Sequence, residues 1–186
     1  MFAPLNEHDP AGQAYHLDDP QSRQRWAFIK ADQLFRKLKW QSFLNEIWNR
    51  FTRRPNRLAD LDSVLVNRKI QGSFPSGIQT IPVHKIIGSE GRSQDFDPVF
   101  RPRREHDRLR WTNIATLLLI GKSLPPISVI RVGPHYIVRD GNHRVSVVRA
   151  LGQKSIEAEV ITLQTTGQPE MASSYCSTPL PCFEAA

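Results

Sequence analysis

The sequence predicts a small α/β (α+β) domain preceded by a basic helical segment, and three observations lead to that expectation. The chain of 186 residues, 39% of them hydrophobic, suits one compact core with attached segments. Segments with the helical period of 3.6 are interspersed with short strand-like runs bounded by Gly and Pro. The positive charge is concentrated, because residues 21–57 hold ten Lys and Arg against two acidic residues, or +8 in a chain whose total is +7.

Residues 21–53 contain neither Gly nor Pro and are predicted to be helical. Their apolar stripe changes sides near residue 39: the apolar residues from Ala27 to Leu38 share one face, and those from Trp40 to Phe51 share a nearly opposite face. Either the segment breaks into two helices there, or one long helix packs its halves on different partners. A single helix lying on a membrane surface would keep one apolar face, so this pattern argues against that class.

A short helix is predicted over residues 58–69, which completes a basic helical extension over residues 21–70. A loop marked by Gly72, Pro75 and Gly77 is expected next, followed by a strand from Ile78 to Ile87.

The remaining elements follow in a regular order. A helix is predicted over residues 104–120, ended by Gly121, and two strands over residues 127–132 and 136–139 are joined by a Gly-Pro turn. A helix over residues 142–151, with Asn142 as N-cap, precedes a last strand over residues 155–162. The predicted domain therefore spans residues 78–162.

The two ends of the chain are expected to be loose. Residues 1–20 hold three prolines and one glycine without an apolar period, which is typical of a flexible leader. Beyond Leu163 the composition becomes polar and Pro-rich, so residues 163–186 are expected to be a disordered tail. Both cysteines, Cys176 and Cys182, lie in that tail, where we expect neither a disulfide framework nor a paired-Cys metal site.

Membrane and secreted classes are not expected. The longest apolar run, Ile114–Ile120, contains Thr116 and is far shorter than the roughly 18 residues that a membrane helix needs. The N-terminus has no basic region followed by an apolar one, as a secretory signal would. The sequence thus predicts a cytoplasmic protein without a membrane partner.

The clearest motif runs from Tyr136 to Gly152, where a strand leads through a glycine turn directly into a helix. The unpaired amides and the dipole at such a helix start favour an anion. Gly141 permits close approach of the backbone, Arg144 can fork onto phosphate oxygens, and Arg139 can reach the same anion if its side chain faces the pocket. The alternative is an ordinary strand–helix junction in which Arg144 pairs with a carboxylate.

The block Asp140-Gly-Asn-His-Arg-Val-Ser-Val-Val-Arg-Ala resembles the Gly-x-x-Arg helix start of the ParB N-terminal and sulfiredoxin superfamily. The upstream run from Ile81 to Phe96 resembles the first conserved box of ParB proteins, and the two boxes occur in the right order over residues 78–162. The resemblance implies a small mixed sheet with packed helices and a nucleotide-phosphate pocket. Members include CTP-dependent DNA clamps, an ATP-using peroxiredoxin-repair enzyme and a free-serine kinase.

Two departures from the family narrow these activities. Sulfiredoxins require a catalytic cysteine where this chain has Asn142, which excludes sulfiredoxin chemistry unless a cysteine of the tail reaches the site. ParB proteins carry a helix-turn-helix region after this domain, but only about two dozen residues follow the last predicted strand here. The resemblance leaves NTP hydrolysis or kinase-type phosphoryl transfer open, with Mg²⁺ and CTP, ATP or ADP as the expected cofactors.

The resemblance also implies roles for individual residues. The nucleotide-phosphate ligands would be Arg92, Arg139, Gly141, Asn142, His143 and Arg144. Asp140 would contact Mg²⁺ indirectly, and Glu90 would act as catalytic base. For His143 the alternative is a hydrogen-bonded structural histidine, and for Glu90 an ordinary surface glutamate.

A second hypothesis belongs to a different class: a non-enzymatic module that binds DNA through the basic residues of segment 21–57. Such binding should weaken steeply with salt, because phosphate contacts release condensed counterions. The nucleotide base and the oligomeric state cannot be read from these patterns.

Overall fold

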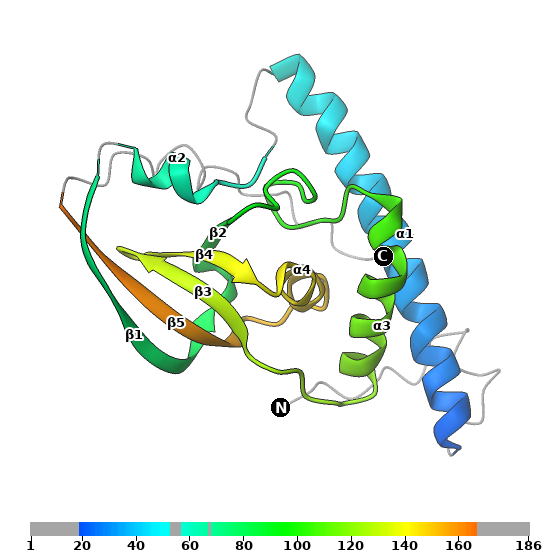
Figure 1. Cartoon of the computed structure of the whole chain (residues 1–186). Helices are drawn as coiled ribbons and strands as arrows, with labels where there is room; N and C mark the ends of the chain where they lie inside the picture. The colour runs from blue at the N-terminus through cyan, green and yellow to red at the C-terminus, as the bar shows by residue number, and fades with distance from the viewer. Residues whose placement is uncertain (1–18, 53–56, 67, 167–186) are drawn as a thin grey trace.

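The computed structural model describes residues 19–52, 57–66 and 68–166, which form a five-stranded mixed sheet and helices stacked against it (Figure 1). The elements are α1 (Pro20–Thr52), α2 (Leu61–Leu65), β1 (Lys69–Pro82), the 3₁₀ turn η1 (Val83–Lys85), β2 (Ile86–Ser89), η2 (Glu105–Asp107), α3 (Arg108–Leu119), β3 (Ile127–Val132), β4 (His135–Asp140), α4 (Asn142–Ala150) and β5 (Ser155–Thr166). The predicted α+β class is confirmed.

The sheet has the strand order β1-β5-β3-β4-β2. The β1–β5 and β3–β4 pairs are antiparallel, whereas β3–β5 and β2–β4 are parallel. The parallel β3–β5 pair arises because α4 carries the chain back across the sheet after β4. That crossover places the start of α4 at the end of β4.

Helices α4, α3 and α1 form successive layers outward from one side of the sheet (Figure 1). One buried cluster fills the space between the sheet, α4 and the segment around Phe96 and Phe100. A second joins α1 to α3 and α4, with Phe35 and Trp111 fully buried at a ring-centroid distance of 5.6 Å. The first half of α1 is therefore part of the fold, because its removal would uncover this cluster.

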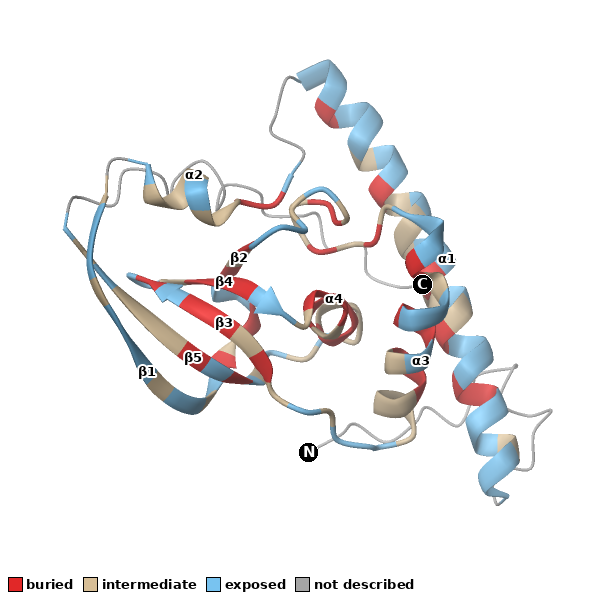
Figure 2. Ribbon diagram, viewed as in Figure 1, coloured by how far each residue is buried: buried red, intermediate tan, exposed pale blue. Residues whose placement is uncertain are grey.

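The interpretation of segment 21–53 as two separate helices is wrong, because α1 is one helix of 33 residues. Its first half packs on α3 along the stripe from Ala27 to Leu38. The apolar residues of its second half are exposed in the chain (Figure 2).

The structure corrects the prediction for the region between α1 and β2. The expected loop at Gly72, Pro75 and Gly77 lies inside β1, which begins at Lys69 within the predicted extension of residues 21–70. Two register irregularities absorb these residues, and β1 is an edge strand, where Gly and Pro interrupt the fewest ladder bonds. The expected strand over residues 78–87 is divided by η1, and its second part, β2, pairs at the opposite edge of the sheet.

Several boundaries also differ. The helix predicted over residues 58–69 is limited to α2, where Asp60 and Ser63 form a capping box. Residues 163–166, predicted to be tail, extend β5 because they pair with the early part of β1. Residues 1–18 of the predicted leader and 167–186 of the predicted tail lie outside the described residues. Among the described helices, none combines the length and apolar character needed to cross a membrane.

Candidate functional site

The start of α4 is built around Gly141. This residue, not Asn142 as predicted, is the N-cap of α4 and has φ +100°. A Cβ at this position would lie 2.5 Å from Ile127 Cγ2, so no other residue fits without displacement. The tight turn leaves the first amides of α4 without carbonyl partners inside the helix, and the first helical bond recorded there runs from Val145 N to Gly141 O.

Two buried polar side chains stand at this helix start. Asn142 and His143 are each only 5% exposed. Asn142 Oδ1 and both ring nitrogens of His143 have no hydrogen-bond partner among the described residues. Because a buried polar group without a partner costs about 1–3 kcal/mol, such atoms mark a place where a ligand can supply what the fold does not.

His143 lies between an aromatic ring and a carboxylate. The Phe96 ring meets the imidazole edge-on at a centroid distance of 5.4 Å, and Nε2 lies 3.3 Å from Asp107 Oδ1 without alignment for a hydrogen bond. Burial lowers the pKa of His143; Asp107 opposes that shift, while the positive charges of Arg110 and Arg92 reinforce it. His143 is therefore neutral at pH 7 in the ligand-free protein.

The loop that carries Arg92 is fixed by a network of ion pairs. The Asp95 carboxylate lies 3.1 Å from Arg104 and 4.0 Å from Arg92. Asp97, fully buried, accepts hydrogen bonds from the amides of Val99 and Arg101. The loop thus holds Arg92, half exposed, close enough to His143 to affect its pKa.

Arg144 is engaged within the fold. Its Nη1 donates to the carbonyls of Pro125 and Pro126 at 2.6 and 2.7 Å, and its Nη2 donates to Asp140 Oδ2 at 2.6 Å. This geometry matches the alternative in which Arg144 pairs with a carboxylate. The pair with Asp140 would have to open before the same Nη2 could reach a phosphate.

Glu90 and Arg139 also face one another, with Glu90 Oε2 3.7 Å from Arg139 Nε and both side chains about half exposed. The roles predicted for Glu90 as base and Arg139 as phosphate ligand stay predictions.

The described residues offer few ligands for the expected Mg²⁺. Within the described residues, no three His, Cys, Asp or Glu side chains converge on a common point. One carboxylate oxygen of Asp140, Oδ2, accepts a hydrogen bond from Arg144. The described residues therefore build no metal site of their own, and the Mg²⁺ assignment stays a prediction that depends on oxygens supplied by a ligand.

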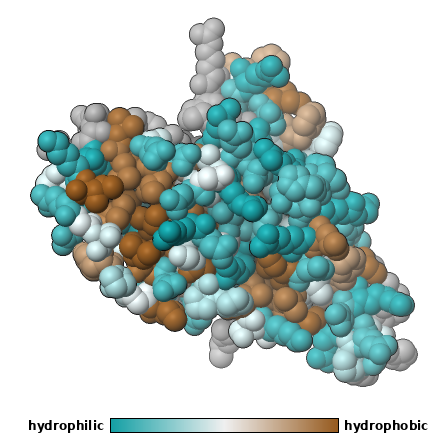
Figure 3. All heavy atoms as spheres, viewed as in Figure 1, coloured by the Kyte–Doolittle hydropathy of each residue, from teal (hydrophilic) through white to brown (hydrophobic). Residues whose placement is uncertain are grey.

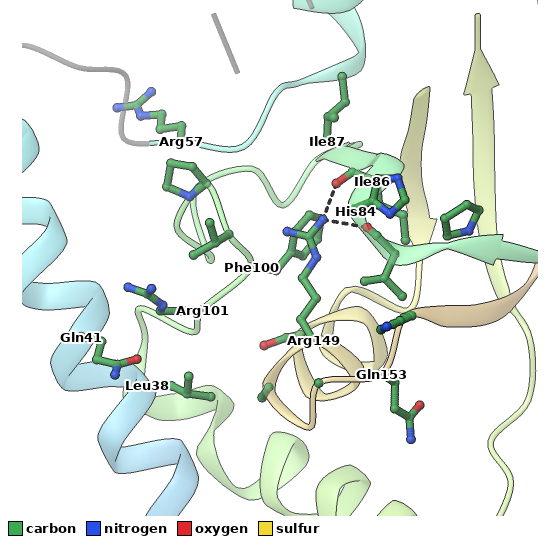
Figure 4. Close-up of a pocket in the computed structure, with 18 residues that line it drawn as sticks. Leu38, Gln41, Arg57, His84, Ile86, Ile87, Phe100, Arg101, Arg149 and Gln153 are labelled. Atoms are coloured by element: carbon green, nitrogen blue, oxygen red, sulfur yellow. Dashed lines mark hydrogen bonds between the residues drawn. The ribbon is translucent and has the colours of Figure 1, made fainter. Parts of the chain in front are cut away.

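A cavity of about 900 Å³ lies elsewhere, between the second half of α1, the turn around Phe100 and the C-terminal end of α4 (Figure 4). At its centre, Arg149 Nη2 donates to the carbonyls of Val83 and Ile86, and the guanidinium lies 4.8 Å from the Phe100 ring centroid. Burial lowers the pKa of Arg149 to about 10. Its central cation serves the fold, so the start of α4 is the stronger candidate site.

The basic residues of segment 21–57 that are described in α1 are exposed, apart from the half-buried Lys39. Some have acidic partners: Arg36 lies 3.0 Å from Asp32, and Lys39 pairs with Glu105. DNA binding through this surface stays a prediction.

Asp107 and Arg110 belong to the site but were not anticipated. Their sequence signal is weak, because a run of alternating charges such as residues 101–110 is typical of a solvated surface. Only the packing of α3 on α4 brings Asp107 and Arg110 to His143.

No protein-family model matches the chain, and no curated protein sequence matches it. Among solved structures, the chain is similar to the crystal structure of sulfiredoxin from Arabidopsis thaliana, with 26% sequence identity and a TM-score of 0.32. The similarity covers 45% of this chain and 82% of that one.

Proposed function

We propose that the N-terminal end of α4 binds the phosphate groups of a nucleotide. The observation that carries this proposal is the start of α4, which favours anions, with His143 buried there and neither of its ring nitrogens hydrogen-bonded among the described residues. Arg92 and Arg110 add positive potential, as their effect on the pKa of His143 indicates.

The carboxylate of Asp107 gives the site a specific chemical signature. The negative charge of Asp107 repels a bound phosphate unless His143, which lies beside Asp107, is protonated and offsets that repulsion. A bound phosphate therefore raises the pKa of His143, and binding near neutral pH takes up a proton. Affinity should rise as the pH falls from 7.5 to 6.

Phosphoryl transfer or NTP hydrolysis belongs to this proposal as a further step. Such chemistry needs a group that orients the nucleophile, and Glu90, which pairs with Arg139, is the candidate that the sequence offers. Turnover measured beside binding separates an enzyme from a binding protein, and Glu90→Gln is the informative variant: it should keep binding and lose turnover.

The test is calorimetric titration of the full chain with CTP, ATP, ADP and GTP, with and without Mg²⁺, in two buffers of different ionisation enthalpy. Asn142→Asp and His143→Gln should each weaken binding about 10–100-fold, the loss expected for one charge-assisted hydrogen bond. His135→Gln is the matched control, because His135 also has a pKa lowered by burial but lies at the opposite end of β4.

Absence of binding by all four nucleotides at millimolar concentration would refute the proposal, as would binding unaffected by either site variant. Arg144→Ala is a poor test, because it also removes two hydrogen bonds that connect α4 to the segment before β3 and a third to Asp140 at the end of β4.

A further inference from the structure

The second half of α1 presents its apolar side to solvent. Six side chains make up this outer face: Trp40, Phe43, Leu44, Ile47, Trp48 and Phe51, which are 59%, 51%, 47%, 40%, 65% and 83% exposed. They cover an arc of about 140° on the helix surface. Exposed residues dominate the upper end of α1 in Figure 2, and brown atoms gather there in Figure 3.

The helix cannot roll to bury this face. Its inward side is polar: Ser42 and Asn49 are buried, and Glu46 lies 2.8 Å from Arg103 in the loop before η2. Nearer the N-terminal end of the same helix, Ala31 and Phe35 are fully buried on that same side. The rotation of α1 is thus fixed at both ends, and none of the residues that the structure describes covers the outer face.

The exposed area of the outer face is as large as a protein interface requires. Since a large aromatic side chain can bury roughly 150–250 Å², the six side chains together expose on the order of 800 Å². One partner in a standard protein–protein interface contributes about that area. Isolated exposed apolar residues are ordinary, but a contiguous patch of this size marks an interaction site.

The order of the residues points to a second copy of this chain. The outer face is palindromic about the midpoint between Asn45 and Glu46: its spacing is 3, 1, 3, 1, 3, and two aromatic residues flank two aliphatic ones on each side. In an antiparallel pair of identical helices centred there, Trp40 meets Phe51, Phe43 meets Trp48 and Leu44 meets Ile47. A two-fold interface requires this reciprocity, since each contact must occur twice.

The charges are compatible with self-association. Glu46 and Arg50 are the only charged residues between positions 40 and 51, and Glu46 faces its own Arg103. Antiparallel pairing places Arg50 opposite Gln41 of the second copy, so no like charges meet inside the patch. A membrane surface would need apolar and aromatic side chains as well, but would not need the palindromic order.

We propose that the outer face of α1 forms a homodimer by antiparallel pairing with the same face of a second copy. The full chain at about 50 µM should then sediment with twice its monomer mass of 21.3 kDa. Leu44→Glu and Ile47→Lys, each alone, should raise the dissociation constant by at least about 100-fold, since each change occurs twice in the interface.

The predicted register has its own test. In a mixture of the Leu44→Glu and Ile47→Lys variants, Glu at 44 meets Lys at 47 in one contact, and Leu meets Ile in the other. The mixture should therefore recover the dimer that neither variant forms alone. Ile78→Lys, which alters an even more exposed apolar residue on the edge strand β1, is the matched control and should leave the dimer intact.

Four outcomes would overturn the proposal. They are a monomeric wild-type chain at 50 µM, a dimer that survives both α1 substitutions, a dimer lost in Ile78→Lys, and a mixture of variants that stays monomeric. A monomer that binds anionic vesicles through Trp40 and Trp48 would assign the face to a membrane instead.

Discussion

Gly141→Ala is the most direct test of how the start of α4 is built. A methyl group at this position would lie 2.5 Å from Ile127 Cγ2, 2.9 Å from Ile127 Cβ and 3.0 Å from Arg144 Nε. The positive φ costs about 1–2 kcal/mol for a residue with a side chain, and forcing a methyl group into a packed site costs about 1–3 kcal/mol more. We expect a loss of about 2–5 kcal/mol in the free energy of unfolding.

Urea and thermal denaturation measure this loss. Gly121→Ala is the matched control, because Gly121 also has a positive φ, +80°, but its Cβ would have no atom within 4 Å. The control should lose only the conformational contribution of about 1–2 kcal/mol. For a chain of this size, each kcal/mol lost in the free energy of unfolding lowers the melting temperature by about 2–4 °C. Equal losses in the two variants would refute the tight contact between the turn and Ile127.

Three further changes test other parts of the structure. Asp97→Ala should lower the free energy of unfolding by about 2–4 kcal/mol, because two buried amides lose their acceptor. Asp97→Asn should change it by less than about 1 kcal/mol, because it keeps an acceptor and removes the charge of a carboxyl group whose pKa is raised by burial; urea titration at pH 7 compares the two variants. Arg149→Met should cost about 2–3 kcal/mol, seen in the same titration, because the carbonyls of Val83 and Ile86 lose their donor. Stability should fall as the pH decreases below about 6.5, because His143 binds a proton more readily in the unfolded chain than in the folded one. His143→Gln should make the melting temperature depend less on pH between 7.5 and 5.

The elements around α4 could be predicted because local chemistry sets their limits. Gly133 and Pro134 allow only a tight turn between β3 and β4, and Gly141 ends β4 at the point where α4 begins. The boundaries predicted for β3, β4 and α4 lie within one residue of those observed. The anion-favouring helix start follows from the same residues.

Elements that depend on distant partners could not be predicted in this way. The Gly and Pro residues of segment 72–77 look like a loop, yet β5 supplies a partner strand long enough to carry β1 across them. The reversal of the α1 stripe was visible, but which half packs inward depends on Trp111 and Ala115 of α3.

The site divides along the same line. Gly141 and the helix start belong to one local segment, whereas the charged neighbours that affect the pKa of His143 come from η2, α3 and the Arg92 loop. The engagement of Arg144 with Pro125 and Pro126 likewise required the three-dimensional structure, because the chain must return across β3 and β4 to bring these groups together.

A comparison of two buried polar residues of α4, Asn142 and Ser146, tests whether Asn142 serves a ligand or the fold. Asn142 Oδ1 has no partner among the described residues, whereas Ser146 Oγ, one turn later, accepts a 2.9 Å hydrogen bond from Trp111 Nε1. Without ligand, Asn142→Leu should therefore leave stability unchanged or raise it by about 1–2 kcal/mol, because a buried polar group without a partner is replaced by an apolar one of similar size. Ser146→Ala should lower stability by about 1–3 kcal/mol, because the buried indole N–H loses its acceptor. Calorimetry on the same samples should show nucleotide binding lost in Asn142→Leu and retained in Ser146→Ala. If Asn142→Leu destabilises the protein as much as Ser146→Ala does, then Asn142 serves the fold and its lack of a partner says nothing about a ligand.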